Sequence, residues 1–139
     1  MSLEFVLDCS VTMAWFFDDE ASEVTDELLD VLNRDGRAVV AAHWALEVGN
    51  TLIMAGRRKR THVADSSHFL AILDAMPIET DLETTVKAHS ATLALARTHG
   101  LTLYDSAYLY GAPDVRGTGT VPAHRASCCT TVFATLPRC

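Results

Sequence analysis

Apolar residues occur along the chain as short continuous runs that alternate with longer amphipathic stretches. Short runs bounded by polar residues are typical of strands buried on both faces of a parallel sheet. They predict strands over residues 5–7, 38–43 and 77–79. The longer stretches predict helices over residues 12–17, 21–33, 43–58, 62–75 and 82–98, with a further helix at Asp105. Strands that alternate with helices indicate an α/β fold, a sandwich built on a mostly parallel sheet.

The length of 139 residues predicts a single domain over residues 1–139, and no repeat or linker interrupts the chain before residue 111. Hydrophobic residues make up 49% of the chain, but charged residues interrupt every apolar run. No run approaches the roughly 18 residues that a membrane span requires. The start lacks the basic and apolar regions of a secretory signal, so we expect a cytoplasmic protein that does not enter a membrane.

The net charge of −7 excludes nonspecific adhesion to nucleic acid as the main activity, because phosphate would be repelled. Contact with a polyanion must therefore be local or use a cation. None of the four cysteines belongs to a CxxC pair or to a Cys/His cluster with zinc spacing. We expect neither a zinc site nor a disulfide framework.

Three carboxylates stand among apolar residues: Asp8 after the first strand, Glu47 within an apolar helix and Asp105 at a helix start. Each also has a structural interpretation, as a helix N-cap for Asp8 and Asp105 and as an ordinary helix-edge residue for Glu47. Asn50 shares the helix face of Glu47 and is expected to hold it. Together the carboxylates supply hard oxygen ligands, which favour Mg²⁺ or Mn²⁺. Such ions support phosphodiester hydrolysis.

Three segments carry a family resemblance: "FVLDCSVTMAWFF", "WALEVGNTL" and "GLTLYDSAYL", which occur in this order over roughly residues 5–109. They resemble the PIN-domain family, and most closely the VapC-type toxin ribonucleases of toxin–antitoxin systems. The resemblance implies a PIN-like α/β/α sandwich, Mg²⁺- or Mn²⁺-dependent cleavage of RNA, a homodimer and inhibition by a small antitoxin. Asp8, Glu47 and Asp105 match the catalytic and metal-binding acids of the family. Ser10 matches its hydroxyl beside the first acid, and Asn50 matches its helix asparagine.

The chain departs from this family after Leu109. Residues 111–139 contain no Glu, Lys, Ile, Met, Asn or Gln, but hold three of the four prolines and three of the four cysteines. Asp114 is the last acid, and Pro137 stands where we would expect the fourth acid of the family. This divergent segment suggests a shifted reading frame or a rewritten C-terminus. It also predicts that the Asp105 helix stops early, at Gly111, and anchors that carboxylate poorly.

Two other functions fit parts of the sequence. A haloacid-dehalogenase-like phosphatase also has an Asp after its first strand, but it needs a second Asp where this chain has Ser10 and gives Glu47 no role. The stronger alternative is a catalytically impaired PIN-like module that dimerises or binds an antitoxin without turnover. Affinity for Mn²⁺ distinguishes this module from an active nuclease.

Two further motifs have both a functional and a structural interpretation. The basic run at residues 56–60, "GRRKR", suits either a phosphate-binding patch or a helix end, where cations are favoured by the helix dipole. The aromatic residues Trp15, Phe16 and Phe17 are expected in the core or at a dimer contact rather than as stacking platforms for bases.

Overall fold

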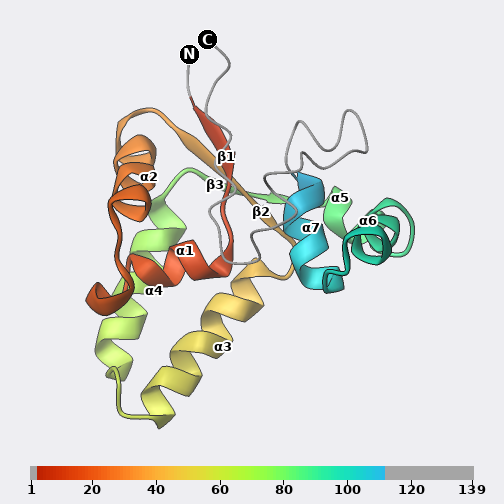
Figure 1. Cartoon of the computed structure of the whole chain (residues 1–139). Coiled ribbons are helices and arrows are strands. Elements are labelled where there is room, and N and C mark those ends of the chain that lie inside the picture. The colour runs from red at the N-terminus through yellow and green to blue at the C-terminus, as the bar shows by residue number, and fades with distance from the viewer. Residues whose placement is uncertain (1–2, 112–139) are drawn as a thin grey trace.

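The computed structural model describes residues 3–111, so Asp114, Pro137 and the predictions for the divergent segment lie outside the described residues. Figure 1 shows the arrangement of the elements. In chain order these are β1 (Glu4–Val6), α1 (Cys9–Ala14), the 3-10 turn η1 (Asp18–Glu20), α2 (Glu23–Arg34), β2 (Arg37–Ala41), α3 (Trp44–Arg57), α4 (Val63–Ala75), β3 (Ile78–Asp81), α5 (Glu83–Val86), α6 (Ala91–His99) and α7 (Leu103–Gly111).

Within residues 3–111 the sheet has the strand order β1-β2-β3, and both pairs of strands are parallel. The predicted parallel α/β architecture is therefore confirmed over this part of the chain. Arg37, at the start of the central strand, forms ion pairs with Glu4 of β1 and with Glu79 of β3. One cation thus ties together all three strands near their amino ends.

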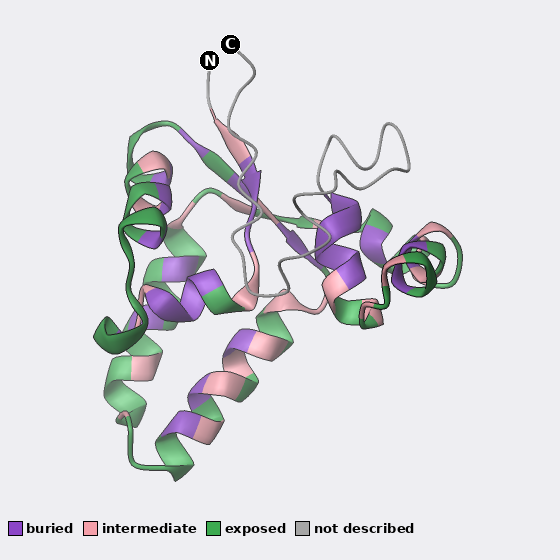
Figure 2. Cartoon of the chain, in the orientation of Figure 1, coloured by how far each residue is buried: buried purple, intermediate pink, exposed green. Residues whose placement is uncertain are grey.

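Alternating residues of the strands pack against helices on opposite faces of the sheet (Figure 1). Phe5 and Leu7 contact the side formed with α1 and α2, whereas Val6 packs with α6 and α7. A further cluster joins α1, α3 and α4 through Met13, Leu52 and other apolar residues. Figure 2 shows these buried positions along the strands and on the inner sides of the helices. The result is an α/β/α arrangement.

Several predicted boundaries are wrong. The first helix begins at Cys9 instead of residue 12, because Asp8 caps it. The single helix predicted over residues 82–98 is two helices, α5 and α6. The short α5 is tied to the sheet by Thr84, whose hydroxyl donates to the Asp81 carbonyl and accepts from the Ala42 amide. These bonds fix α5 in a direction that a continuous helix would not follow.

The expectation that Asp105 is poorly anchored is also wrong. Helix α7 buries every residue from Ser106 to Gly111, and its Leu109 side chain is fully enclosed. It packs against α6 and against β1 and β2, so burial of its apolar side chains holds the helix in place. In the part of the chain that the structure describes, no helix is both long enough and apolar enough to cross a membrane.

Candidate active site

Asp8 follows β1 at the carboxyl end of the sheet, where α/β proteins commonly bind ligands. Its carboxylate accepts a hydrogen bond from the Val11 amide at 2.9 Å and so caps α1, as the structural interpretation predicted. The Ser10 hydroxyl lies 2.9 Å from each of the two carboxylate oxygens. The predicted neighbour Ser10 therefore does orient the first acid, and the cap role and a site role involve the same side chain.

A buried hydroxyl links Asp8 to the start of α3. The Thr12 side chain is fully buried, and its Oγ1 donates to the Asp8 carbonyl at 2.8 Å. The same oxygen accepts a hydrogen bond from Nε1 of Trp44 at 3.0 Å. Since Trp44 is the first residue of α3, this relay fixes the start of α1 relative to the helix that carries Glu47.

Glu47 lies in the first turn of α3, directly after β2, and its side chain is 37% exposed. The predicted partial enclosure is confirmed. Its carboxylate accepts a hydrogen bond from the Tyr108 hydroxyl, and its Oε2 lies 3.6 Å from Nε2 of His43. The predicted partner Asn50 is exposed and instead lines a pocket farther along α3. Tyr108, not Asn50, thus provides the hydrogen bond that positions Glu47.

His43 contacts two tyrosine rings of α7, with ring centroids 5.1 Å from Tyr104 and 4.8 Å from Tyr108. Burial lowers the pKa of His43, and the negative charges of Glu47 and Asp105 oppose this effect. Among residues 3–111, Nε2 of His43 is buried without a hydrogen-bond partner. The imidazole therefore lies near both Glu47 and Asp105.

Asp105 lies in the first turn of α7 and is not its cap. The cap is Thr102, whose Oγ1 accepts a hydrogen bond from the Asp105 amide at 3.1 Å and donates to the Asp105 carboxylate at 2.7 Å. The N-cap interpretation of Asp105 is therefore wrong. The cap residue Thr102 orients this carboxylate. The Asp105 side chain is half-buried and lies near His43.

The charges of Asp8 and Glu47 both affect the pKa values of Cys9 and Tyr108. Burial, with smaller contributions from the charges of Glu47 and Asp8, raises the pKa of the Cys9 thiol to about 11, although a hydrogen bond with Thr51 lowers it. Burial also raises the pKa of Tyr108, together with its hydrogen bond to Glu47 and the nearby charge of Asp8. The structure therefore brings Asp8 and Glu47 to one region. Within residues 3–111, no three His, Cys, Asp or Glu side chains are grouped to hold a single ion.

The sequence interpretation missed His43, Tyr108 and Cys9. His43 precedes Glu47 by four residues, and Tyr108 follows Asp105 by three. These are the spacings at which helical side chains become neighbours, so the signal was present. Cys9 approaches Thr51 to 3.8 Å across 42 residues of sequence, a contact for which the sequence gives no sign.

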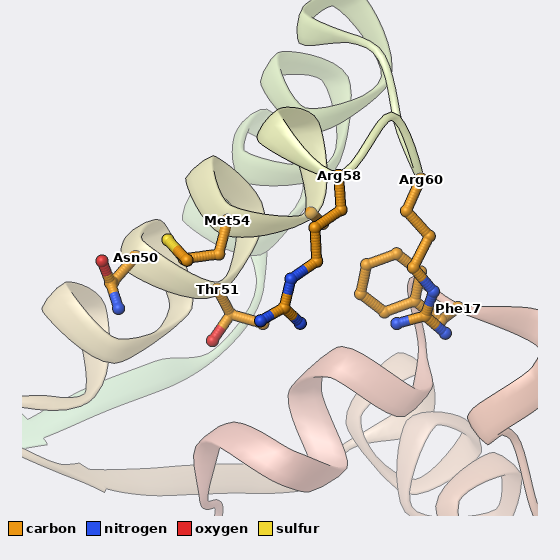
Figure 3. A pocket seen from close by; sticks show the side chains of 7 residues that line it. Phe17, Asn50, Thr51, Met54, Arg58 and Arg60 are labelled. Carbon is orange, nitrogen blue, oxygen red and sulfur yellow. The ribbon is translucent and has the colours of Figure 1, made fainter.

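The basic run separates into residues with different roles beside a pocket of about 250 Å³ (Figure 3). Arg60 pairs with Asp19 at 2.7 Å and with Glu20 at 2.9 Å, and its guanidinium lies 4.0 Å from the centre of the Phe17 ring. Arg60 lies beyond the end of α3 and is held by these side-chain contacts, a role that neither interpretation of the basic run predicted. Arg58 lines the pocket and pairs with no carboxylate in the described part of the chain.

The aromatic triplet has the expected packing role. Phe16 contacts the rings of Phe17 and Phe69, with centroids 4.8 and 4.9 Å apart. Nε1 of Trp15 donates to the Thr25 carbonyl at 2.7 Å. These contacts tie α1 to α2 and α4, and leave the triplet as part of the core.

Comparison with models of known protein families gives no match to this chain, and comparison with curated proteins gives none either.

Proposed function

We propose that this protein is a metal-dependent endoribonuclease of PIN-like, VapC type, the toxin component of a toxin–antitoxin pair. The observation that carries the proposal is the placement of Asp8 and Glu47 after neighbouring parallel strands, with Asp105 near His43, the neighbour of Glu47. Each carboxylate accepts a hydrogen bond from a hydroxyl group: Ser10 for Asp8, Tyr108 for Glu47 and Thr102 for Asp105. Such support is what oriented ligands require.

The donor set suits a hard divalent cation. Mg²⁺ in proteins is commonly held by one or two carboxylates, several waters and the phosphate of the substrate, so it needs no group of three side chains. Asp8 and Glu47 would hold Mg²⁺ or Mn²⁺ in this way, and the charge of Asp105 acts on the adjacent His43. When bound, the ion activates water and neutralises charge that develops on a phosphate.

The residues of the chain supply the remaining requirements. Ser10 and the Val11 amide hold the orientation of Asp8, and Tyr108 does the same for Glu47. The buried Thr12 hydroxyl keeps the two acids in fixed relation through Trp44. Hydrogen bonds that exist before substrate arrives lower the cost of organising the site during the reaction.

The same proposal includes a cytoplasmic location, a homodimer and a small antitoxin as partner. All three are implied by the family resemblance. The two protein contacts are also supported by large apolar side chains that are exposed on the surface. On α3, Leu46 is 77% and Ile53 is 56% exposed. On and beside α5, Leu82 and Val86 are exposed as well. Exposed apolar groups of this kind suit contact with another protein.

Replacement of Asp8 by Asn tests the nuclease. The amide keeps the shape and the helix cap but removes the charge, so RNA cleavage in Mg²⁺ or Mn²⁺ should fall by more than about 100-fold. Asp65→Asn is the matched control, because it removes the same charge from an exposed position in the first turn of α4. Undiminished cleavage by Asp8→Asn, or cleavage that survives EDTA, would overturn the assignment.

One observation favours the second candidate, a PIN-like module that binds partners without turnover. The carboxylates of residues 3–111 do not converge into a group of three ligands. Titration of Mn²⁺ by calorimetry separates the two functions. A nuclease should bind Mn²⁺ and lose this binding in Asp8→Asn, whereas the inactive module should show no site-specific binding in either chain.

A further inference from the structure

A pocket next to the candidate active site contains an arginine, Arg58, that no carboxylate among residues 3–111 neutralises. Figure 3 shows that Arg58 extends from the end of α3 along the side of Thr51, while Arg60 covers Phe17 at the other side. The lining consists of Phe17, Asn50, Thr51, Met54, Ala55, Arg58 and Arg60. Of the residues that the structure describes, no acidic one belongs to this lining, although the protein as a whole carries a net charge of −7.

The pocket and the acidic site share one face of α3. Glu47, Thr51, Met54 and Arg58 follow one another at spacings of four, three and four residues, which places them in a row along a helix. The Thr51 hydroxyl donates to the Glu47 carbonyl at 2.8 Å, so the two regions are adjacent turns. Over eleven residues the row extends about 16 Å along the helix axis. The Arg58 side chain points back along α3 toward Thr51 (Figure 3).

The two arginines at this pocket differ in their interaction partners. Arg60 uses its guanidinium nitrogens for Asp19 and Glu20 and stacks on the Phe17 ring. Its charge is compensated, and it covers the ring face that a base would need for stacking. Arg58 forms no such pairs within residues 3–111, so its fork of N–H donors is available to an anion.

We propose that this pocket binds a backbone phosphate of RNA next to the phosphate held at the acidic site, with Arg58 as the cation. The inference rests on the proposed function, since it names a substrate contact of the same enzyme. The Asn50 amide offers a second donor, and the apolar walls of Phe17, Met54 and Ala55 exclude part of the water. A guanidinium binds phosphate through charge-assisted hydrogen bonds that are commonly bidentate.

RNA fits this arrangement better than an acidic peptide. A strand that presents one phosphate to Asp8 and Glu47 carries its next phosphates at regular intervals, and the row along α3 supplies a cation for one of them. The acidic site alone would repel these flanking phosphates. Arg58 offsets this repulsion at the position where the RNA strand leaves the acidic site.

The test compares Arg58→Gln with Arg57→Gln. Both remove one charge from the end of α3, but Arg57 lies outside the pocket lining, with its guanidinium directed to the Met54 sulfur. Binding of a short single-stranded RNA is measured in Ca²⁺ over a range of salt, with the RNA checked afterwards for intact length. Arg58→Gln should reduce the slope of log affinity against log salt by about 0.7, and Arg57→Gln should retain the parental slope. Equal thermal midpoints show that both variants are folded.

The kinetic outcomes separate this inference from the proposed function. With cleavable RNA, Arg58→Gln should raise KM several-fold and leave kcat unchanged, because the contact binds ground state and transition state alike. If the parent cleaves RNA, Asp8→Asn does not, and Arg58→Gln matches the parent in slope and KM, the phosphate pocket is wrong and the nuclease stands. If the parent fails to cleave but Arg58→Gln alone weakens RNA binding, the nuclease is wrong and the pocket stands. Equal losses in both arginine variants, or Arg58-dependent binding of a poly-glutamate peptide without binding of RNA, would overturn the pocket.

Discussion

Two fully buried threonines provide a direct test of what holds the site together. Thr12 and Thr92 are each 0% exposed, but only Thr12 uses its hydroxyl, which joins the Asp8 carbonyl to the Trp44 indole. The Thr92 hydroxyl has no hydrogen-bond partner among residues 3–111. Substitution of either residue by Val keeps the shape and replaces the hydroxyl by a methyl group. The chemical change is therefore the same, and the surroundings differ.

The expected effects have opposite signs. In Thr12→Val two hydrogen bonds disappear: the bond to the Asp8 carbonyl is worth about 1 kcal/mol, and the loss of the acceptor of the Trp44 N–H costs about 1–3 kcal/mol. The Asp8 carbonyl keeps a bond from the residue 12 amide at 3.3 Å, and the added methyl group contributes about 1 kcal/mol in favour of folding. The net loss is about 2 kcal/mol. Thr92→Val removes a buried unpaired hydroxyl and should stabilise the protein by about 1 kcal/mol.

Equilibrium unfolding in urea measures the difference. A gap of about 3 kcal/mol between the two variants corresponds to about 1–3 M urea in the midpoint at an ordinary m-value. The m-value itself should not change, because neither substitution alters the surface exposed on unfolding. Comparable destabilisation by both substitutions would refute the reasoning, since burial rather than hydrogen bonding would then determine the cost. A stabilised Thr12→Val would refute it as well.

Two further predictions concern the neighbours of the acids. Tyr108→Phe removes the hydroxyl that donates to Glu47 and should weaken Mn²⁺ binding by about 10- to 100-fold, measured by calorimetry, while the free energy of unfolding falls by only about 1 kcal/mol; an unchanged affinity would contradict a supporting role for Tyr108. Because the pKa of Cys9 is about 11 in the folded protein against 9.0 ordinarily, its protonated thiol stabilises the fold below pH 9, and this contribution is lost as the pH rises from 9 to 11. Alkylation of Cys9, followed by peptide mass spectrometry, should accordingly show its midpoint near pH 11 in the folded protein and near pH 9 in urea, and a folded midpoint near 9 would contradict the burial of this thiol.

The sheet and its surroundings were predictable because their cause is local. Buried parallel strands require continuous apolar runs, and such runs marked all three described strands to within two residues. The placement of Asp8 followed from the end of the first run. The break between α5 and α6 did not follow, because no Gly or Pro marks it and the hydrogen bond between the Ala42 amide and Thr84 spans 42 residues of sequence.

The details of the site depend on contacts between distant segments. The apolar helix around Glu47 marks this carboxylate in the sequence. Its hydrogen-bond partner Tyr108 lies 61 residues away, so the sequence points only to the nearer Asn50 as a partner. The basic run likewise gave no means to separate Arg58 from Arg60. Their difference arises at Lys59, whose left-handed backbone, with φ of 58°, turns the chain after α3 and directs the two side chains to different places.

The shared face of α3 also restricts how a gene for this protein can change. Each residue inserted into or deleted from a helix rotates everything beyond it by about 100°, so a single codon gained between Glu47 and Arg58 would carry the arginine away from the row. A change of about seven codons, close to two full turns, would restore the direction, but it would then displace the arginine by about 10 Å. Insertions and deletions are therefore expected at the turn joining α3 to α4, where residues 58–62 are mostly exposed, while α3 itself should vary by substitution alone.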